Sequence, residues 1–272
     1  MSLKFDTIGY WTEPKLEIIE KYAKPYSQIM SSNKFHHVYI DAFAGAGTHI
    51  SKTTLKPVRG SPQIALDVKP PFKEYYFIAI DSEKVDELNR IAAGRSEVKI
   101  FHGDCNSVLL TEVFPKVRYK DYRRGLCLLD PYGLHLDWKV IETAGHMATI
   151  DMFLNFPVAD MNRNVLWRDS QGVDSADITR MNAYWGDDSW MKIAYGKPNL
   201  FNEPWKEDNE VIAAAFQKRL REKAGFKYVA DPLPMKNSKE AVVYYLFFAS
   251  QQKLAGDIHG DIIAKIFNTY RQ

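Results

Sequence analysis

Cysteine is scarce in this sequence of 272 residues, in which Cys105 and Cys127 are the only two. Two cysteines are too few for a disulfide framework or an unaided metal site, so we predict reduced, buried thiols and no metal. Long apolar runs are also missing, since none approaches the roughly 18 residues that a membrane helix needs. The first residues lack the apolar core of a signal peptide, and we therefore expect a cytoplasmic protein with no membrane partner.

An excess of charge of one sign is missing as well. The chain has 36 Lys and Arg against 34 Asp and Glu, a net charge of +2. This balance gives no global electrostatic reason to bind nucleic acid, so any basic patch must be local. An apolar content of 46% with 26% charged residues is ordinary for a globular protein. The length suits one large domain or one domain with an insertion.

A short apolar run from Val38 to Asp41 ends on a carboxylate and leads into a loop with Phe43, Gly45 and Gly47. Such a run predicts a strand that is buried on both faces. Glycine accepts positive φ and has no Cβ, so a ligand can approach the loop backbone closely. Asp41 would lie at the carboxyl end of the strand, where open α/β sheets bind ligands.

The glycine loop lacks part of the dinucleotide-binding fingerprint. Ile50 stands where the third glycine of that fingerprint belongs, and the next strand-end acid, Asp81, lies about twice as far on as the usual roughly 20 residues. A nicotinamide-dependent oxidoreductase therefore fits poorly. The other structural interpretation is an ordinary strand and turn whose glycines serve geometry alone.

Four more predicted strands each lead to a polar side chain. Because the carboxyl ends of parallel strands share one edge, these side chains should gather there; helix capping is the alternative role for the acids. The predicted strands cover 75–80, 98–101, 126–129 and 151–155, and they lead to Asp81, Asp104, Asp130 and Asn155. Predicted helices cover 13–31, 61–68, 83–92, 136–147, 207–223 and 258–270.

The first helix should end or bend at Pro25. Its residues Lys15 and Lys21, with Tyr10 and Trp11 just before it, either line a substrate mouth or belong to a helix that covers the sheet edge. The basic segment 49–59 is predicted as an insertion, either a mobile flap or a plain solvated loop. Ser61 should then cap the next helix, with Pro62 at its first position.

Residues 158–206 interrupt the alternation of strands and helices. The segment is rich in Asn, Asp, Trp and Arg, and we predict a mostly helical insertion that selects a substrate or a partner. Arg163, Arg168 and Arg180 lie near tryptophans and could contact phosphates and bases, although packing of the tryptophans explains the same pattern. Beyond it, 226–233 and 241–249 are predicted to form a terminal hairpin.

The segment from Asp41 to Gly47 resembles motif I of the class I S-adenosylmethionine (SAM)-dependent methyltransferases. The resemblance implies a Rossmann-like α/β fold over residues 1–272, with a seven-stranded, mostly parallel sheet, one antiparallel strand and helices on both faces. SAM is the implied cofactor. The motif I loop would hold the methionine and ribose of SAM. Asp81 would accept the ribose hydroxyls, and Asp104 would accept the adenine amino group. The implied cofactor-binding residues are Asp41, Phe43, Gly45, Gly47, Asp81, Asp104 and Cys105.

The segment Asp130-Pro131-Tyr132-Gly133 resembles motif IV of the amino-methyltransferases, the D/N-P-P-Y box. The resemblance implies that Asp130 and the carbonyl of Pro131 accept hydrogen bonds from a target amine while Tyr132 stacks on a flipped base. The second proline is missing, so Tyr132 stands one place early, and the same four residues also form a common turn. Asn155 and Arg163 would lie near the bound substrate.

Over roughly residues 10–270 the chain resembles the three-Cys-motif partner protein family, TcmP. The segments that carry this resemblance are 41–47, 60–62, 103–106, 129–133, 155–157 and 161–164. That family name implies a protein partner with a three-cysteine motif. The leading hypothesis is a SAM-dependent methyltransferase that acts on an amino group of a nucleic-acid base. The second hypothesis is a SAM-binding, non-catalytic or degenerate subunit that serves the three-cysteine partner.

Overall fold

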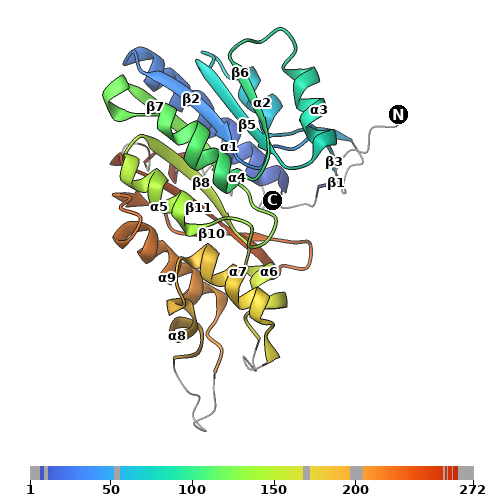
Figure 1. Ribbon diagram of the computed structural model, residues 1–272, viewed down its shortest axis with the longest axis vertical. Coiled ribbons are helices and arrows are strands. Elements are labelled where there is room, and N and C mark those ends of the chain that lie inside the picture. The colour runs from blue at the N-terminus through green and yellow to red at the C-terminus, as the bar shows by residue number, and fades with distance from the viewer. Residues whose placement is uncertain are drawn as a thin grey trace.

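A central β-sheet organises the protein in this computed structural model (Figure 1). The structure describes residues 7–8, 12–51, 56–167, 172–196, 205–253, 255, 257–258 and 260–262. The strands run in the order β10-β11-β8-β7-β2-β5-β6, and β9 also pairs with β11. Their bounds are β2 His36–Asp41, β5 Glu74–Ala79, β6 Val98–His102, β7 Arg123–Leu129, β8 Ile150–Phe156, β9 Tyr228–Val229, β10 Leu233–Lys236 and β11 Val242–Ser250.

The sheet confirms the predicted α/β architecture with a mostly parallel sheet. Strands β6, β5, β2, β7 and β8 are parallel, whereas β11 runs antiparallel to β8, β9 and β10. The sheet has eight strands rather than the predicted seven because the short strand β9 also pairs with the end of β11.

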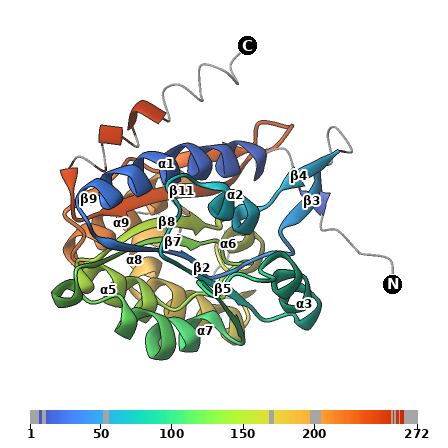
Figure 2. The same ribbon diagram turned by 90° about the horizontal axis from the view of Figure 1, so that it is seen from above.

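Helices cover both faces of the sheet, as predicted, and Figure 2 shows α1 and α5 on opposite sides. One hydrophobic cluster joins the sheet to α1, α2 and α3, and a second joins it to α5, α7, α8 and α9. No helix among the described residues is both long and apolar enough to cross a bilayer. The helices are α1 Thr12–Ser32, α2 Ser61–Asp67, α3 Ser82–Ile91, α4 Cys105–Val108, α5 Trp138–Met147, α6 Val158–Asn164, α7 Ser175–Trp185, α8 Ser189–Tyr195 and α9 Asn209–Glu222. Shorter 3-10 and π-helical turns cover Leu109–Val113, Phe114–Lys116 and Tyr119–Asp121.

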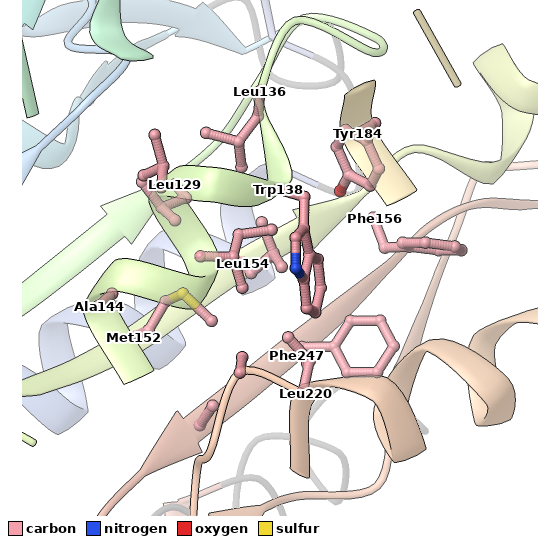
Figure 3. Close-up of a cluster of buried hydrophobic side chains, with 14 of the residues drawn as sticks. Leu129, Leu136, Trp138, Ala144, Met152, Leu154, Phe156, Tyr184, Leu220 and Phe247 are labelled. Carbon is pink, nitrogen blue, oxygen red and sulfur yellow. The ribbon is translucent and has the colours of Figure 1, made fainter. Parts of the chain in front are cut away.

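The predicted insertion shares the second cluster with the sheet. In Figure 3, Trp138 lies at the centre of this cluster, with Leu154 on one side and Phe156 on the other. Tyr184 of α7 belongs to the same cluster, and its ring stacks on Phe216 of α9 with centroids 5.8 Å apart. Helix α7 therefore packs into the main hydrophobic core.

The described residues on either side of 52–55 are paired strands, which corrects the plain solvated loop that was one of the two predictions for segment 49–59. Strand β3, Thr48–Ser51, pairs antiparallel with β4, Pro57–Arg59, and parallel with β1, Thr7–Ile8. Residues 52–55 lie outside the described part of the chain. Arg59 fixes the base of the hairpin, because its guanidinium lies 2.8 Å from Glu20 and 2.9 Å from Asp67.

Helix α1 continues through Pro25 to Ser32, so the helix does not end at the proline. Side chains of α1 on both sides of Pro25, including Tyr22 and Tyr26, are buried against the sheet. This burial stabilises the helix against the loss of one backbone hydrogen bond.

The terminal strands also differ from their predicted bounds. Strand β10 includes Pro234 and Met235, which had been placed in a turn. The proline is tolerated because β10 lies at the edge of the sheet, where one side of the strand needs no partner. Most of the predicted helix 258–270 lies outside the described residues.

Candidate functional site

The buried carboxylate of Asp41 anchors the loop that follows β2. Its Oδ1 accepts the backbone N–H of Phe43 at 3.3 Å, and its Oδ2 accepts the hydroxyl of Ser61 at 2.5 Å. Ser61 was expected to cap α2, but the N-cap is Gly60, which makes no side-chain cap hydrogen bond. The Ser61 hydroxyl instead links the start of α2 to the end of β2.

Burial raises the pKa of Asp41 to about 6. The hydrogen bond from Ser61 opposes this rise, and the nearby carboxylate of Asp130 adds to it. A buried charge needs hydrogen bonds or a counter-ion. Asp41 accepts the two hydrogen bonds described above, and the positive charge of Lys15 acts as its counter-ion.

The glycine loop is held tightly between neighbouring strands. The N–H of Ala42 bonds to the carbonyl of Leu128 in β7, and the N–H of Ala44 bonds to Ile78 next to the loop. Gly47 has φ +80°, and an added Cβ would lie 3.0 Å from the side chain of Ile91. Glycine is therefore required at this point of the loop, because the backbone has a positive φ and because a side chain would have too little space. Gly45 is buried in the same loop.

A cleft of about 270 Å³ opens at the carboxyl ends of β2, β5 and β6. Its walls are mostly apolar, with carboxylates at their edge. The cleft brings together five of the predicted site residues: Phe43, Asp81, Asp104, Cys105 and Tyr132. Further lining residues are Ala42, Ala44, Ile78, Ala79, Ile80, Lys84, Gly103 and His135.

Asp81 and Asp104 cap helices as well as line this cleft. Oδ1 of Asp81 accepts the N–H of Glu83 at 2.8 Å, at the start of α3. Oδ2 of Asp104 accepts the N–H of Ser107 at 2.9 Å, at the start of α4. The alternative role of helix capping thus holds for both acids. Both residues also line the cleft, and a carboxylate oxygen can accept more than one donor.

Cys105 lies in the cleft wall as a buried, free thiol, and Cys127 is also buried and free, as predicted. Burial raises the pKa of Cys105 to about 12 and raises that of Cys127 as well. Both thiols are therefore protonated at neutral pH and are poor nucleophiles. Among the described residues, no group of three or more His, Cys, Asp or Glu could hold a metal ion.

Two lining residues of interest were missed by the sequence reasoning. Ile80, at the end of β5, is 77% exposed beside the cleft and offers an apolar surface to a ring. Lys84 of α3 donates a hydrogen bond to the Tyr132 hydroxyl at 3.2 Å, and its Nζ lies 5.2 Å from the centroid of that ring. The position of Ile80 directly before Asp81 could have indicated that it lies at the site. The contact between Lys84 and Tyr132 could not be predicted, because it depends on the fold.

Asp130, Asn155 and Asp41 lie on one face of the sheet. In the strand register, Leu128 is beside Asp41 and beside Phe153, and Asp130 and Asn155 each follow two residues later. Side chains two residues apart in a strand point the same way, so the three polar groups share the face that α1 covers. Asn155 is 8% exposed, and its Oδ1 has no hydrogen-bond partner in the described part of the chain.

Lys15 of α1 reaches this row of polar groups from above the sheet. It is buried, its ammonium donates a hydrogen bond to Oδ2 of Asp130, and Nζ lies 5.6 Å from the centroid of the Tyr244 ring. Lys21 is instead exposed and paired with Glu17 at 2.6 Å. Only the first of these two lysines therefore lies at the site, and Tyr10 and Trp11 are outside the described residues.

Arg163 lies apart from these groups on the exposed surface of α6, where its carbonyl accepts the indole N–H of Trp167 at 2.7 Å. Arg180 pairs with Asp177 one turn earlier in α7. Arg168 lies outside the described residues. Helix α6 also touches the Asp130 loop, since a Cβ on Gly133 would lie 2.6 Å from Oδ2 of Asp160.

No family model and no curated protein matches this chain. Among solved structures, it is similar to protein LPL1258 from Legionella pneumophila, described by the family model DUF519, with TM-score 0.53, 13% identity, and coverage of 94% of this chain and 92% of that one. It is less similar to a putative methyltransferase from Thermobifida fusca, with TM-score 0.41, 12% identity, and coverage of 88% and 82%. A third similar structure is the methyltransferase CalH in complex with SAH, with TM-score 0.40, 14% identity, and coverage of 86% and 57%.

The strand order and the first of these likenesses define the class of the protein by its fold, which is an α/β fold with a mostly parallel sheet and one antiparallel pairing. The comparisons do not identify the three-Cys-motif partner family, so that resemblance stays a prediction.

Proposed function

We propose that the protein binds SAM in the cleft and transfers the methyl group of SAM to an amino group on a nucleic-acid base. The observation that carries the proposal is a row of oxygen acceptors at the carboxyl ends of β7 and β8, which follow β2 in the order of the sheet. Asp130 and the unpartnered Oδ1 of Asn155 lie on one sheet face at its carboxyl edge. A buried acceptor without a donor costs about 1–3 kcal/mol, so a ligand N–H that reaches Asn155 would recover this energy.

The cleft residues suit the nucleoside part of SAM. Asp81 makes one cap bond through Oδ1, which leaves Oδ2 for ribose hydroxyls, and Ile80 offers an apolar surface to the adenine ring. Asp104 can accept the adenine amino group. The loop after Asp41 approaches this space with Phe43 at its wall. SAM supplies an electrophilic methyl group on a sulfonium that leaves as a neutral thioether.

The protein's own residues would mainly orient the acceptor. The carboxylate of Asp130 and the amide oxygen of Asn155 accept the N–H groups of the amine and aim its nitrogen at the methyl carbon. The carboxylate of Asp130 would stabilise positive charge that develops on the nitrogen of the amine. The surplus proton then leaves to water. No strong base is needed, because the leaving group is already a good one.

A nucleic-acid base is the acceptor that the rim favours. Tyr132 is 67% exposed two residues after Asp130, so its ring is available to stack on a base. Stacking of this kind contributes about 1–3 kcal/mol per base. Arg163 and the exposed Trp167 lie on the neighbouring helix and the turn after it, where they could contact a strand beyond the flipped base.

Two measurements test the proposal. Calorimetry with S-adenosylhomocysteine and with NAD decides the ligand class, and we expect heat from the first ligand alone. Transfer of labelled methyl from SAM to total RNA, DNA and protein then identifies the acceptor. We expect Asp130→Asn to bind S-adenosylhomocysteine as the wild type does and to transfer at least about 10² times more slowly. Unaltered transfer by this variant would remove Asp130 from its role.

A second candidate is a SAM-binding subunit without its own chemistry, which serves a protein with a three-cysteine motif. Two observations favour it: the second proline of motif IV is missing, and the ammonium of Lys15 already contacts Asp130. This candidate predicts binding of S-adenosylhomocysteine but no transfer by the isolated chain. Repeating the transfer assay with the partner present distinguishes a subunit that needs its partner from one that never transfers.

A further inference from the structure

We propose that Lys15 is a positioning residue whose one ammonium group balances two neighbouring carboxylates, Asp41 of the cofactor loop and Asp130 of the acceptor motif, so that both can carry charge together. This inference deepens the proposed function and rests on it for its consequence in ligand binding. Its structural part concerns Lys15, Asp41 and Asp130 alone and can be tested without any ligand.

The geometry places the three groups together. Asp41 ends β2 and Asp130 follows β7, which is the neighbouring strand, and both side chains are on the face covered by α1. Lys15 enters from α1 and is only 5% exposed, with its ammonium bonded to Asp130. A lysine is seldom buried to this degree without a paired charge, so its position ties α1 to the two strands that carry the site.

The charges of the three groups act on one another. The carboxylate of Asp130 raises the pKa of Asp41, and the ammonium of Lys15 lowers it. Two carboxylates that share a site cannot easily be ionised together, because each disfavours the charge of the other. One ammonium between them relieves this repulsion. Without Lys15, Asp41 would bind a proton at neutral pH and lose the negative charge that suits the α-ammonium group, which SAM and S-adenosylhomocysteine share.

The other titratable groups around this site do not supply the missing positive charge. Tyr39 of β2, Cys127 of β7 and Tyr244 of β11 are buried, and burial raises the pKa of each, so they are neutral at pH 7. From α2, the neighbouring group is the uncharged hydroxyl of Ser61. On α1 itself, Glu13 buries one carboxylate oxygen and can only add negative charge.

Aspartate labelled with ¹³C at its carboxyl group lets the titration of Asp41 be followed directly by NMR, with Asp41→Asn used to assign its signal. In Lys15→Met we expect the titration midpoint of Asp41 to rise by about 1–3 pH units. Lys15→Arg should keep the wild-type midpoint. Lys21→Met is the matched control, because Lys21 belongs to the same helix but pairs with Glu17 on its exposed side.

Charge complementation separates this role from packing. In Lys15→Met with Asp130→Asn, one carboxylate is gone together with the ammonium, and the midpoint of Asp41 should fall back toward the wild-type value. An unchanged midpoint in Lys15→Met would overturn the proposal. Lys15→Gln provides the same neutralisation with a polar side chain if the methionine variant does not fold.

The consequence for the site is measured with S-adenosylhomocysteine as the probe. A rise of the Asp41 midpoint from about 6 by about 1–3 units leaves about one half to one hundredth of the carboxylate ionised at pH 7. Lys15→Met should therefore bind the probe about 2- to 90-fold more weakly at pH 7 and should recover as the pH rises above the new midpoint. Weak binding at every pH would instead show a packing role and overturn the proposal. Absence of binding by the wild type would refute the proposed function, while the titration of Asp41 would still decide the role of Lys15.

Discussion

At the scale of single residues, Asp41 combines a structural role with an energetic cost. Its carboxylate ties β2 to α2 through Ser61, and its burial raises its pKa to about 6 from an ordinary value of 3.8. The folded state therefore binds this proton more tightly than the unfolded state does. Stability from this group is present below the unfolded pKa and is lost as the pH rises through the folded pKa.

We predict that Asp41→Asn becomes more stable relative to the wild type as the pH rises from about 4 to about 6. The full difference across this window is about 3 kcal/mol, less the cost of any weakened hydrogen bond from Ser61. The gain comes with weaker binding of S-adenosylhomocysteine, because the negative charge is gone. Urea unfolding of both proteins at a series of pH values measures the first effect, and calorimetry measures the second.

Asp151 provides a matched control for this prediction. It is half-buried near the start of β8, at the opposite edge of the sheet, and desolvation of its carboxyl group likewise raises its pKa to about 6. Its carboxylate accepts hydrogen bonds from Tyr22 at 2.9 Å and from Ser250 at 2.6 Å. Asp151→Asn should show a similar pH-dependent gain in stability with unchanged affinity for S-adenosylhomocysteine. Equal loss of affinity in both variants would show that Asp41 has no special relation to the ligand.

At the scale of secondary-structure elements, strand β7 has an exposed tyrosine beyond each of its ends. Tyr132 follows the carboxyl end, and Tyr122 directly precedes the amino end with 72% of its surface exposed. Tyr132 lies beside Asp130 and the cleft, whereas Tyr122 lies next to Phe35, with ring centroids 6.5 Å apart. The two positions differ in what lies near them rather than in their exposure.

We predict that Tyr132→Ala weakens transfer to a nucleic-acid acceptor and that Tyr132→Phe does not. Loss of the stacking ring should lower kcat/KM by about 5- to 150-fold, which corresponds to about 1–3 kcal/mol. The phenylalanine keeps the ring and loses only the exposed bond from Lys84. Tyr122→Ala is the control and should transfer normally. Equal rates for Tyr132→Ala and Tyr132→Phe would exclude stacking as the role of Tyr132.

Some of the strands could be predicted from the sequence, and others could not. Strands β2, β5, β7 and β8 were predictable because each is a short apolar run that the sheet buries on both faces. Strand β6 is only half-buried at the sheet edge, but its apolar residues and the acid that follows it gave the same pattern, and the acids after β5 and β6 fixed the candidate cleft. The hairpin of β3 and β4 was not, because its segment is polar and its pairing depends on β1, which is distant in the chain. Local patterns carry no information on such pairing.

The same limit applies to the site. Lys15 was placed near a substrate mouth from its position in an amphipathic helix, but its bond to Asp130 spans 115 residues of sequence. Ser61 was interpreted as a cap because serine before proline has that local meaning, whereas its hydroxyl serves Asp41 on another element. Strand ends can be predicted from apolar patterns, but contacts made by covering helices require the packed structure.

At the scale of the whole molecule, one core extends from the sheet into the segment that the sequence presented as an insertion. Trp185 of α7 is 1% exposed, and its ring lies 5.3 Å from Phe216 of α9, measured between centroids. Phe216 in turn lies 4.6 Å from Phe156 of β8. A continuous chain of aromatic contacts therefore connects the insertion to the central sheet, and the two should unfold together.

We predict that Trp185→Ala lowers the free energy of unfolding by about 3–5 kcal/mol, because a large buried ring leaves a cavity that neighbouring side chains cannot fill. Trp205→Ala is the control: Trp205 is 48% exposed, and its loss should change stability by less than about 0.5 kcal/mol. Urea unfolding followed both by far-UV circular dichroism and by tryptophan fluorescence should give coincident transitions in each protein. An early transition in Trp185→Ala seen by fluorescence alone would mean that α7 and α8 unfold separately, and that the insertion is attached to the α/β fold without being part of its core.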